Sequence, residues 1–187
     1  CFCRSSRTIT ASSLALCDSK GKILEGKNQV EDTAFHIHSR IHLKAPHARC
    51  VMHTHMPYAL ALCTVEGGRL EMCEQNAIRF YDRIAYDDVY NGVALSSDEG
   101  DRIAAALGNR TISFMASHGV VVVGRDVEEA TINTISLEQL AEMNYITAVL
   151  GTPRVVPQAD IEKLAAATTD LDTWTYYSHM VSTDDLE

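Results

Sequence analysis

The sequence predicts an α/β or α+β fold in which a β-sheet is layered by helices. Short β-rich runs alternate with stretches of helical periodicity along the chain. Two of these runs flank a Ser117-His118-Gly119 corner, and the longest helical pattern, residues 126–150, follows them directly. Sheets and helices that each carry an apolar face bury it against one another, so this mixed order favours a layered architecture.

The first half of the chain should form a hairpin, a helix, a strand and a second helix. The turn residues Asp18 to Gly21 separate the two apolar runs of the hairpin. Asp32 or Thr33 can cap the first long helix, and Gly67-Gly68 should end the second. The predicted elements are strands at 14–17 and 22–24, a helix from 32 or 33 to about 44, a short buried strand at 50–52 that breaks off at the histidine pair, and a helix at 58–65.

The second half begins with residues 70–79, whose pattern favours neither helix nor strand. Ser96 or Ser97 can cap a helix that Gly108 ends, and Asp126 can cap the long helix. The predicted elements are a strand at 84–86, a helix from 96 or 97 to 107, strands at 111–115 and 120–123, a helix at 126–150 and a short helix near 160–167. Helical spacing predicts two buried stripes: Ala34, Ile37, His38, Ile41 and Ala45, then Ala130, Thr134, Leu137, Leu140, Ala141 and Tyr145.

Length and composition indicate one domain over residues 1–187, with residues 157–187 as a peripheral C-terminal tail that carries Trp174, Tyr176 and Tyr177. The chain begins without methionine and in mid-pattern, so we expect it to lack an N-terminal segment. The formal net charge is −9, and no basic cluster is present. These features argue against nucleic-acid and anionic-membrane partners and leave a small-molecule substrate as the expected partner.

The cysteines indicate a cytoplasmic protein. Six cysteines lie among apolar neighbours without paired metal-binding spacing: Cys1, Cys3, Cys17, Cys50, Cys63 and Cys73. We interpret them as reduced thiols. No apolar run is long enough to cross a membrane, and no signal peptide is visible.

His53 and His55 are the first candidate functional residues. They follow the apolar run Cys50-Val51-Met52, and Pro57 comes just after them. Residues two apart in a strand point the same way, so both imidazoles should project from the strand end toward one point. A divalent metal needs such a pair as its first two ligands, although surface or core histidines have this spacing more often.

Other histidines could complete such a site. His118 lies at the predicted corner, where Gly119 allows close backbone approach, but only the fold could bring it to the pair. His38 and His42 are four residues apart, as metal-binding histidines on a helix can be. No acidic base accompanies them, so we expect His38 to be a hydrogen-bonded core group or a support for a site.

These motifs together resemble the class II aldolase/adducin family. The resemblance runs from about Ile9 to Val156 and depends on the segments ITASSLALCDSKGKILEG, FHIHSRIH, CVMHTHMPYALAL, EQNAIRFYDRIAYDDVYNG and ASHGVVVVG. It implies a three-layer sandwich with a central mixed or antiparallel sheet flanked by helices. It also implies a homotetramer with its active site near the subunit interface.

The resemblance implies that His53, His55 and His118 bind a divalent metal, most often zinc; iron, manganese and cobalt remain open. It also implies a glutamate as ligand and acid/base four residues before His38, where this chain has Ala34. Alanine can neither coordinate a metal nor accept a proton. The family's glycine- and serine-rich anion loops are not found either, which puts a sugar-phosphate substrate in question.

Other residues could supply the missing acid or base. We predict Glu74 and Tyr86 as catalytic candidates, with Gln75, Tyr81 and Tyr90 as further polar groups near the same segment. For each of them a surface or structural role is the competing interpretation.

Three functions fit these observations. The first is a metal-dependent carbon–carbon lyase of aldolase or decarboxylase type, acting on a small hydroxy acid, keto acid or sugar-derived substrate. The second is a non-enzymatic adducin-like interaction module. Alanine at position 34, in place of the family's glutamate, favours this function, whereas the complete set of three histidines argues against it. The third is a non-haem iron oxygenase, because three neutral histidines with an open position also suit ferrous iron.

Overall fold

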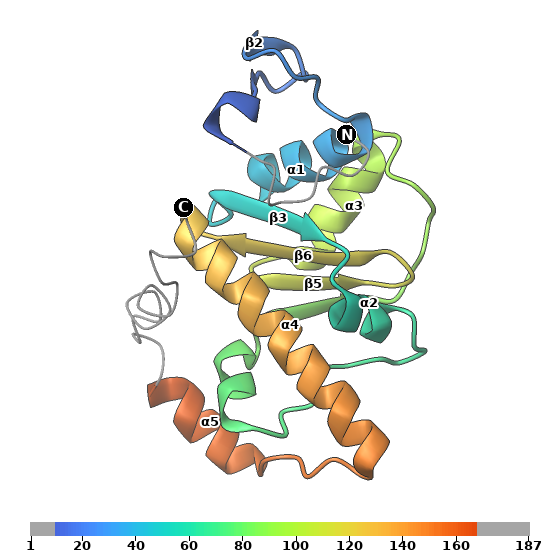
Figure 1. Cartoon of the computed structure of the whole chain (residues 1–187), viewed down its shortest axis with the longest axis vertical. Helices are drawn as coiled ribbons and strands as arrows, with labels where there is room; N and C mark the ends of the chain where they lie inside the picture. Colours follow the sequence, from blue (N-terminus) through green and yellow to red (C-terminus); the bar gives the residue numbers. More distant parts are fainter. Residues whose placement is uncertain (1–9, 168–187) are drawn as a thin grey trace.

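The computed structural model describes residues 10–167 (Figure 1). The elements, in chain order, are η2 (Ala11–Ser13), β1 (Leu16–Cys17), β2 (Ile23–Glu25), α1 (Asp32–Lys44), β3 (Cys50–Thr54), α2 (Pro57–Cys63), η3 (Gln75–Phe80), β4 (Ile84–Asp87), α3 (Ser97–Leu107), β5 (Ile112–Met115), β6 (Gly119–Gly124), α4 (Val127–Leu150) and α5 (Gln158–Ala167). The predicted mixed fold with a central sheet between helices is confirmed.

The central sheet has the strand order β3-β6-β5-β4. Strand β6 pairs antiparallel with both β3 and β5, whereas β4 runs parallel to β5. Thr54 lies opposite Val120, Met115 opposite Gly119, and Asp87 opposite Met115. The C-terminal ends of β3, β4 and β5 and the start of β6 therefore meet at one edge of the sheet. The predicted strands around Ser117-His118-Gly119 form this β5–β6 hairpin.

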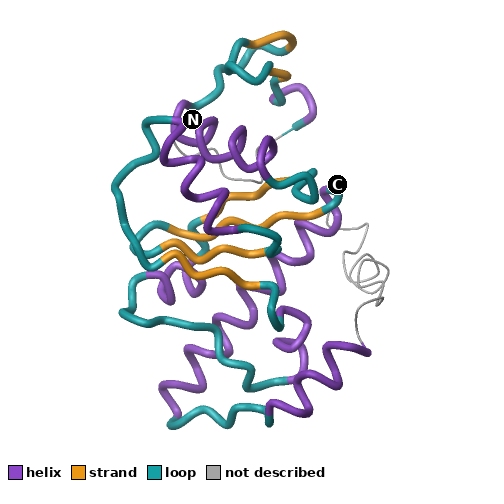
Figure 2. Tube along the Cα trace, turned by 180° about the vertical axis from the view of Figure 1, so that it is seen from behind, coloured by secondary structure: helices purple, strands orange, loops and turns teal. Residues whose placement is uncertain are grey.

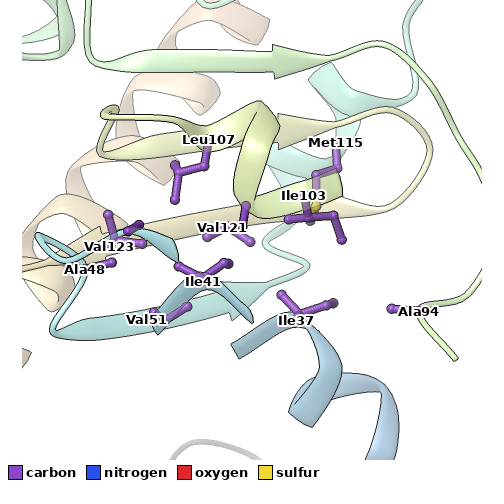
Figure 3. Close-up of a cluster of buried hydrophobic side chains, with 12 residues drawn as sticks. Ile37, Ile41, Ala48, Val51, Ala94, Ile103, Leu107, Met115, Val121 and Val123 are labelled. Carbon is purple, nitrogen blue, oxygen red and sulfur yellow. The ribbon is translucent and has the colours of Figure 1, made fainter. Parts of the chain in front are cut away.

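Helices cover both faces of the sheet, as seen from two sides in Figures 1 and 2. Alternate residues of β6 point to opposite faces. Val121 and Val123 pack with residues of α1 and α3 (Figure 3), whereas Val120 and Val122 pack with residues of α2, η3 and α4. A strand buried on both faces reads as a continuous apolar run, which explains the sequence Val120 to Val123.

Side-chain caps explain where α1 and α4 start, whereas Ser96 precedes α3 without making the capping hydrogen bond that the sequence allowed. Asp126 accepts a hydrogen bond from the Glu129 N–H and caps α4, as predicted. Helix α1 starts at Asp32, but its cap is Glu31 rather than Asp32 or Thr33, since the Glu31 side chain accepts from the Ala34 N–H.

The structure corrects the predicted burial of Tyr145 and assigns the stretch 70–79, which the sequence left open. Tyr145 is 55% exposed and does not belong to the buried stripe, because Asn144, at 7% exposed, faces the interior at this turn of α4 instead. The ambiguous stretch 70–79 contains the start of a 3₁₀ helix, η3, which buries Ala77, Ile78 and Phe80.

The predicted C-terminal tail begins with a packed element. Helix α5 contacts η3, and its Ile161 is 3% exposed. Trp174, Tyr176 and Tyr177 lie outside the described residues. Within residues 10–167, no helix combines the length and apolarity that a membrane crossing requires. The single-domain organisation and the missing N-terminal segment stay predictions.

Candidate metal centre

Strand β3 delivers the histidine pair to the sheet edge where the strand ends meet. His53 lies opposite Val121 in the sheet, and His55 follows the last residue of the strand. Pro57 then begins α2, where its missing N–H is no loss because the first helical N–H groups have no partner within the helix. The pair is therefore held between a sheet and a helix start.

The corner between β5 and β6 delivers His118. Ser117 adopts the left-handed conformation with φ 54°, which turns the chain tightly before β6 begins. A Cβ atom on Gly119 would lie 2.6 Å from His55 Cδ2 and 2.7 Å from the Thr54 carbonyl oxygen. Only glycine at position 119 therefore lets the corner approach the histidine pair so closely.

The fold brings the three predicted histidines together. One ring nitrogen from each of His53, His55 and His118 lies within 4.8 Å of the others. The Nε2 atoms of His53 and His55 are 3.3 Å apart, and the ring centroids are separated by 4.8 to 5.4 Å. Among residues 10–167, this is the one group of three or more histidine, cysteine or acidic side chains whose ligand atoms converge in this way. The metal-ligand role of the group stays a proposal.

The surroundings of His53 and His118 favour the neutral, metal-binding form of these two imidazoles. Burial, together with the neighbouring His118, lowers the pKa of His53 to about 4. Burial followed by the charge of His55 also lowers the pKa of His118. Because metal ligation requires the unprotonated imidazole, protons compete weakly with a metal at these two side chains near neutral pH.

The hydrogen bonding of His53 also fits a metal ligand. His53 Nδ1 lies 3.1 Å from the Val120 carbonyl oxygen, which can only accept, so Nδ1 carries the proton. The lone pair is then on Nε2, the atom that faces His55. Such a bond on the second ring nitrogen is typical of metal-binding histidines, because it fixes both tautomer and ring orientation.

The helical histidines do not join this group. His42 Nδ1 lies 2.9 Å from the Ala48 carbonyl oxygen, so it bridges the end of α1 to the following loop. His38 is half-buried, and burial lowers its pKa. It is close enough to His53 to influence the pKa of that residue, which suits the supporting role expected for it.

The acids at the start of α1, Glu31 and Asp32, do not belong to the converging group. Glu31 acts as the helix cap: its Oε2 accepts from the Thr33 hydroxyl at 2.6 Å and from the Ala34 N–H at 2.7 Å. These hydrogen bonds, that of Thr33 first, lower the pKa of Glu31 and keep it ionised.

The predicted catalytic candidates have structural partners away from the histidines. Glu74 caps η3 and accepts from the Asn76 N–H at 2.9 Å. The Tyr86 hydroxyl accepts from the Leu70 N–H at 3.0 Å, and its ring stacks on Phe114. Glu74 does not belong to the converging group of ligand atoms among the described residues. Their catalytic role stays a prediction without support from this geometry.

The remaining polar candidates are exposed or have a structural partner. Tyr81 accepts a hydrogen bond at 2.8 Å from Gln158 of α5. Tyr90 is 55% exposed on the loop that follows β4, and Gln75 is exposed at the start of η3.

A charged network beside His118 was missed from the sequence. Arg102 of α3 bonds Glu99 at 2.6 Å and Asp87 at 2.5 Å. Glu99 raises the pKa of His118, and Arg102 lowers it, so both side chains lie within electrostatic reach of the site. The three-residue spacing of Glu99 and Arg102 was the available signal, but it also fits an ordinary surface pair on a helix.

Comparisons with known proteins identify the family and agree with the fold. Residues 2–145 match the family described as Class II Aldolase and Adducin N-terminal domain. The chain is 30% identical over 138 residues to L-fuculose phosphate aldolase from Methanococcus maripaludis (strain C5), covering 74% of this chain and 72% of that protein. It is 28% identical over 158 residues to Decarboxylase NovR from Streptomyces niveus, covering 84% of this chain and 58% of that protein.

A solved structure shares the whole architecture. The aldolase II superfamily protein from Pseudomonas syringae superposes with a TM-score of 0.83 at 26% identity, covering 93% of this chain and 71% of that one. The chain spans little more than half the length, 57% and 58%, of two of the curated relatives that it matches. The family match over most of the chain, with a shared fold and a histidine cluster at the sheet edge, shows that this protein belongs to the class II aldolase and adducin family.

Proposed function

We propose that the protein is a divalent-metal-dependent carbon–carbon lyase, of aldolase or decarboxylase type, acting on a small hydroxy acid, keto acid or sugar-derived substrate. The observation that carries the proposal is the convergence of His53, His55 and His118 within 4.8 Å. The similarity to a protein named as an aldolase and to one named as a decarboxylase supports both branches of this chemistry.

The donor set suits zinc best among the candidates. Three neutral imidazoles on one side leave coordination positions for a substrate, as in catalytic zinc sites. Iron, manganese and cobalt accept the same ligands. A bound divalent ion would supply Lewis acidity toward a carbonyl or carboxylate oxygen. The chain's own part is to orient the imidazoles through Val120 and Gly119 and to keep His53 and His118 neutral by burial.

The absence of an acid at position 34 favours decarboxylation over aldol cleavage. Aldol chemistry of the glutamate-dependent kind requires a base beside the carbonyl, and Ala34 cannot serve. In decarboxylation, the carbon–carbon bond to the departing carbon dioxide breaks first, and a proton is needed only afterwards. The nearby carboxylate of Glu31 is already used as a helix cap and does not fill this gap.

Reconstitution tests the proposal. The protein is stripped with a chelator and reloaded separately with zinc, ferrous iron, manganese or cobalt. Each form is then incubated with a panel of 2-hydroxy acids, 2-keto acids and sugar-derived aldols. We expect release of carbon dioxide or an aldehyde only from a metal-loaded form, and its loss in His53→Ala. Undiminished turnover by the metal-free protein would contradict the proposal.

Two other functions predict different outcomes. Ala34 is the observation that favours an adducin-like interaction module, which would keep the fold without needing the metal. A purified protein that binds less than about one-tenth of a metal per chain when offered an excess would favour that module. A ferrous oxygenase would consume dioxygen and lose its activity under anaerobic conditions, whereas the proposed lyase would not.

We propose a cytoplasmic location as part of this assignment. Four described cysteines, Cys17, Cys50, Cys63 and Cys73, are free thiols, which supports a reducing compartment.

A further inference from the structure

We propose that Cys63 is a positioning residue that holds the His118 imidazole in place for metal binding. This inference rests on the proposed metal site, because it concerns how one of its three ligands is fixed. It goes beyond the ligand set itself and assigns a role to a buried cysteine.

Cys63 makes one hydrogen bond on each side of His118. Its carbonyl oxygen accepts from the Ser117 N–H at 2.8 Å, and its thiol donates to the Gly119 carbonyl oxygen at 3.3 Å. The residues before and after His118 are therefore both tied to one residue of another element. The backbone on both sides of His118 is thus held against the end of α2.

The chain path explains why this residue can reach the corner. Helix α2 begins just after His55 and ends at Cys63, with Ala59 and Cys63 buried in the same cluster as Val120. The segment 53–63 thus carries two of the three ligands at its start and the support for the third at its end.

The thiol suits this task in its protonated form. Cys63 is 7% exposed, and burial raises its pKa to about 11, so it remains a neutral donor near neutral pH. Only a protonated thiol can donate to the Gly119 carbonyl. The support also acts on a strained turn, because Ser117 has φ 54° and needs surrounding contacts to hold it there.

A mere packing role makes a different prediction. If Cys63 only fills space, its replacement lowers the stability of the metal-free protein but leaves the metal affinity of the folded protein unchanged. If it positions His118, replacement alters the affinity and the ligand geometry as well. Hydrogen bonds that orient metal ligands typically change affinity by about 10- to 100-fold when they are removed.

Cobalt(II) binding distinguishes these cases in the full chain. Dissociation constants, visible d–d spectra and metal-free melting temperatures are measured for wild type, Cys63→Ala, Cys63→Val and Cys63→Ser. Valine removes the donor without leaving a large cavity, so it covers the case in which the alanine variant does not fold. Serine restores a hydroxyl donor. Cys50→Ala is the control, since Cys50 is a half-buried cysteine that lies opposite Gly124 at the far end of β3.

We expect Cys63→Ala and Cys63→Val to bind cobalt at least about five-fold more weakly than the wild type and to show an altered spectrum. The dissociation constants of Cys63→Ser and Cys50→Ala should differ from that of the wild type by less than about five-fold. A smaller change in the alanine and valine variants, or a serine variant as weak as valine, would overturn the positioning role while leaving the metal site intact. Failure of the wild type to bind cobalt would instead overturn the proposed function, and this inference with it.

Discussion

The lowered pKa of His53 should make the stability of the metal-free protein depend on pH. Its pKa is about 4 in the folded chain because of burial, against 6.5 for an ordinary histidine. Between these values the unfolded chain binds more protons, so folding becomes less favourable as the pH falls from above 6.5 toward 4. At pH 5 the loss should be about 2 kcal/mol in the free energy of unfolding.

Urea unfolding of the chelator-treated protein at pH 7.5 and pH 5 measures this loss. In His53→Gln the titrating group is absent, so the difference between the two pH values should shrink by a similar amount. An identical pH dependence in the variant and the wild type would show that His53 does not have the lowered pKa.

Ser117 offers a second test at the level of one side chain. A non-glycine residue at φ 54° pays a steric cost that glycine avoids. We expect Ser117→Gly to raise the free energy of unfolding by roughly 0.5–1 kcal/mol, since the greater freedom of glycine in the unfolded chain offsets part of the gain. Thermal or urea unfolding measures it, with Ser117→Ala as a control that keeps the strain. Equal stability of the glycine and alanine variants would argue against strain at this turn.

The histidine cluster could be predicted from the sequence because strand alternation placed His53 and His55 together, and the family resemblance added His118. The roles of Glu99, Arg102 and Cys63 could not. Each depends on contact between residues far apart in the chain, and none has a spacing that separates it from ordinary surface or core residues.

At the level of elements, helix α2 is anchored by a side chain of α4. The two carboxylate oxygens of Glu138 accept from the Tyr58 and Ala59 N–H groups, each at 3.0 Å. These are first-turn donors that have no partner within α2. Glu138 therefore fixes the start of the helix that follows His55.

Removing this anchor should destabilise the protein. We expect Glu138→Ala to lower the free energy of unfolding by about 1–2 kcal/mol and Glu138→Gln by less, since one amide oxygen can still accept. Denaturant unfolding measures both, and Gln139→Ala on the exposed side of α4 is the control. A Glu138→Ala variant as stable as the Gln139 control would contradict the anchoring role.

The elements themselves were largely predictable, because their caps and periodicity are local. The Asp126 cap, the α1 range and the β5–β6 corner follow from nearby residues. Residues 75–80 did not show a helical period, because a 3₁₀ turn is too short to express one. The exposure of Tyr145 could not be predicted, since helical spacing does not tell which of two neighbouring residues, Asn144 or Tyr145, faces the interior.

At the level of the whole molecule, the sheet order is what assembles the site. The antiparallel β3–β6 pair sets the histidine pair beside the corner, and the parallel β4–β5 pair sets Asp87 at the same edge. Strand order and direction depend on long-range pairing. The family resemblance implied a mixed or antiparallel sheet, but the sequence did not show which strands would be neighbours.

Exposed apolar side chains on α4 fit the homotetramer that the family resemblance implies. The C-terminal part of α4 exposes apolar side chains, including Ile146, Val149 and Leu150 at 41%, 69% and 83%. Such a surface is typical of an interface between subunits. We expect light scattering to give about four times the chain mass of 20.6 kDa, and Ile146→Glu to reduce it. A monomeric wild type would contradict the tetramer.

Metal binding by the three histidines is tested most directly by equilibrium dialysis against zinc, with elemental analysis of the protein. The wild type should bind about one zinc per chain, and His53→Ala, His55→Ala and His118→Ala should each weaken binding by at least about 100-fold. His47→Ala, whose side chain instead lies 3.1 Å from the Arg110 carbonyl oxygen, should bind as the wild type does. Binding of less than about one-tenth of a zinc per wild-type chain would contradict the metal centre. So would zinc affinities of the three histidine variants that equal the affinity of the wild type.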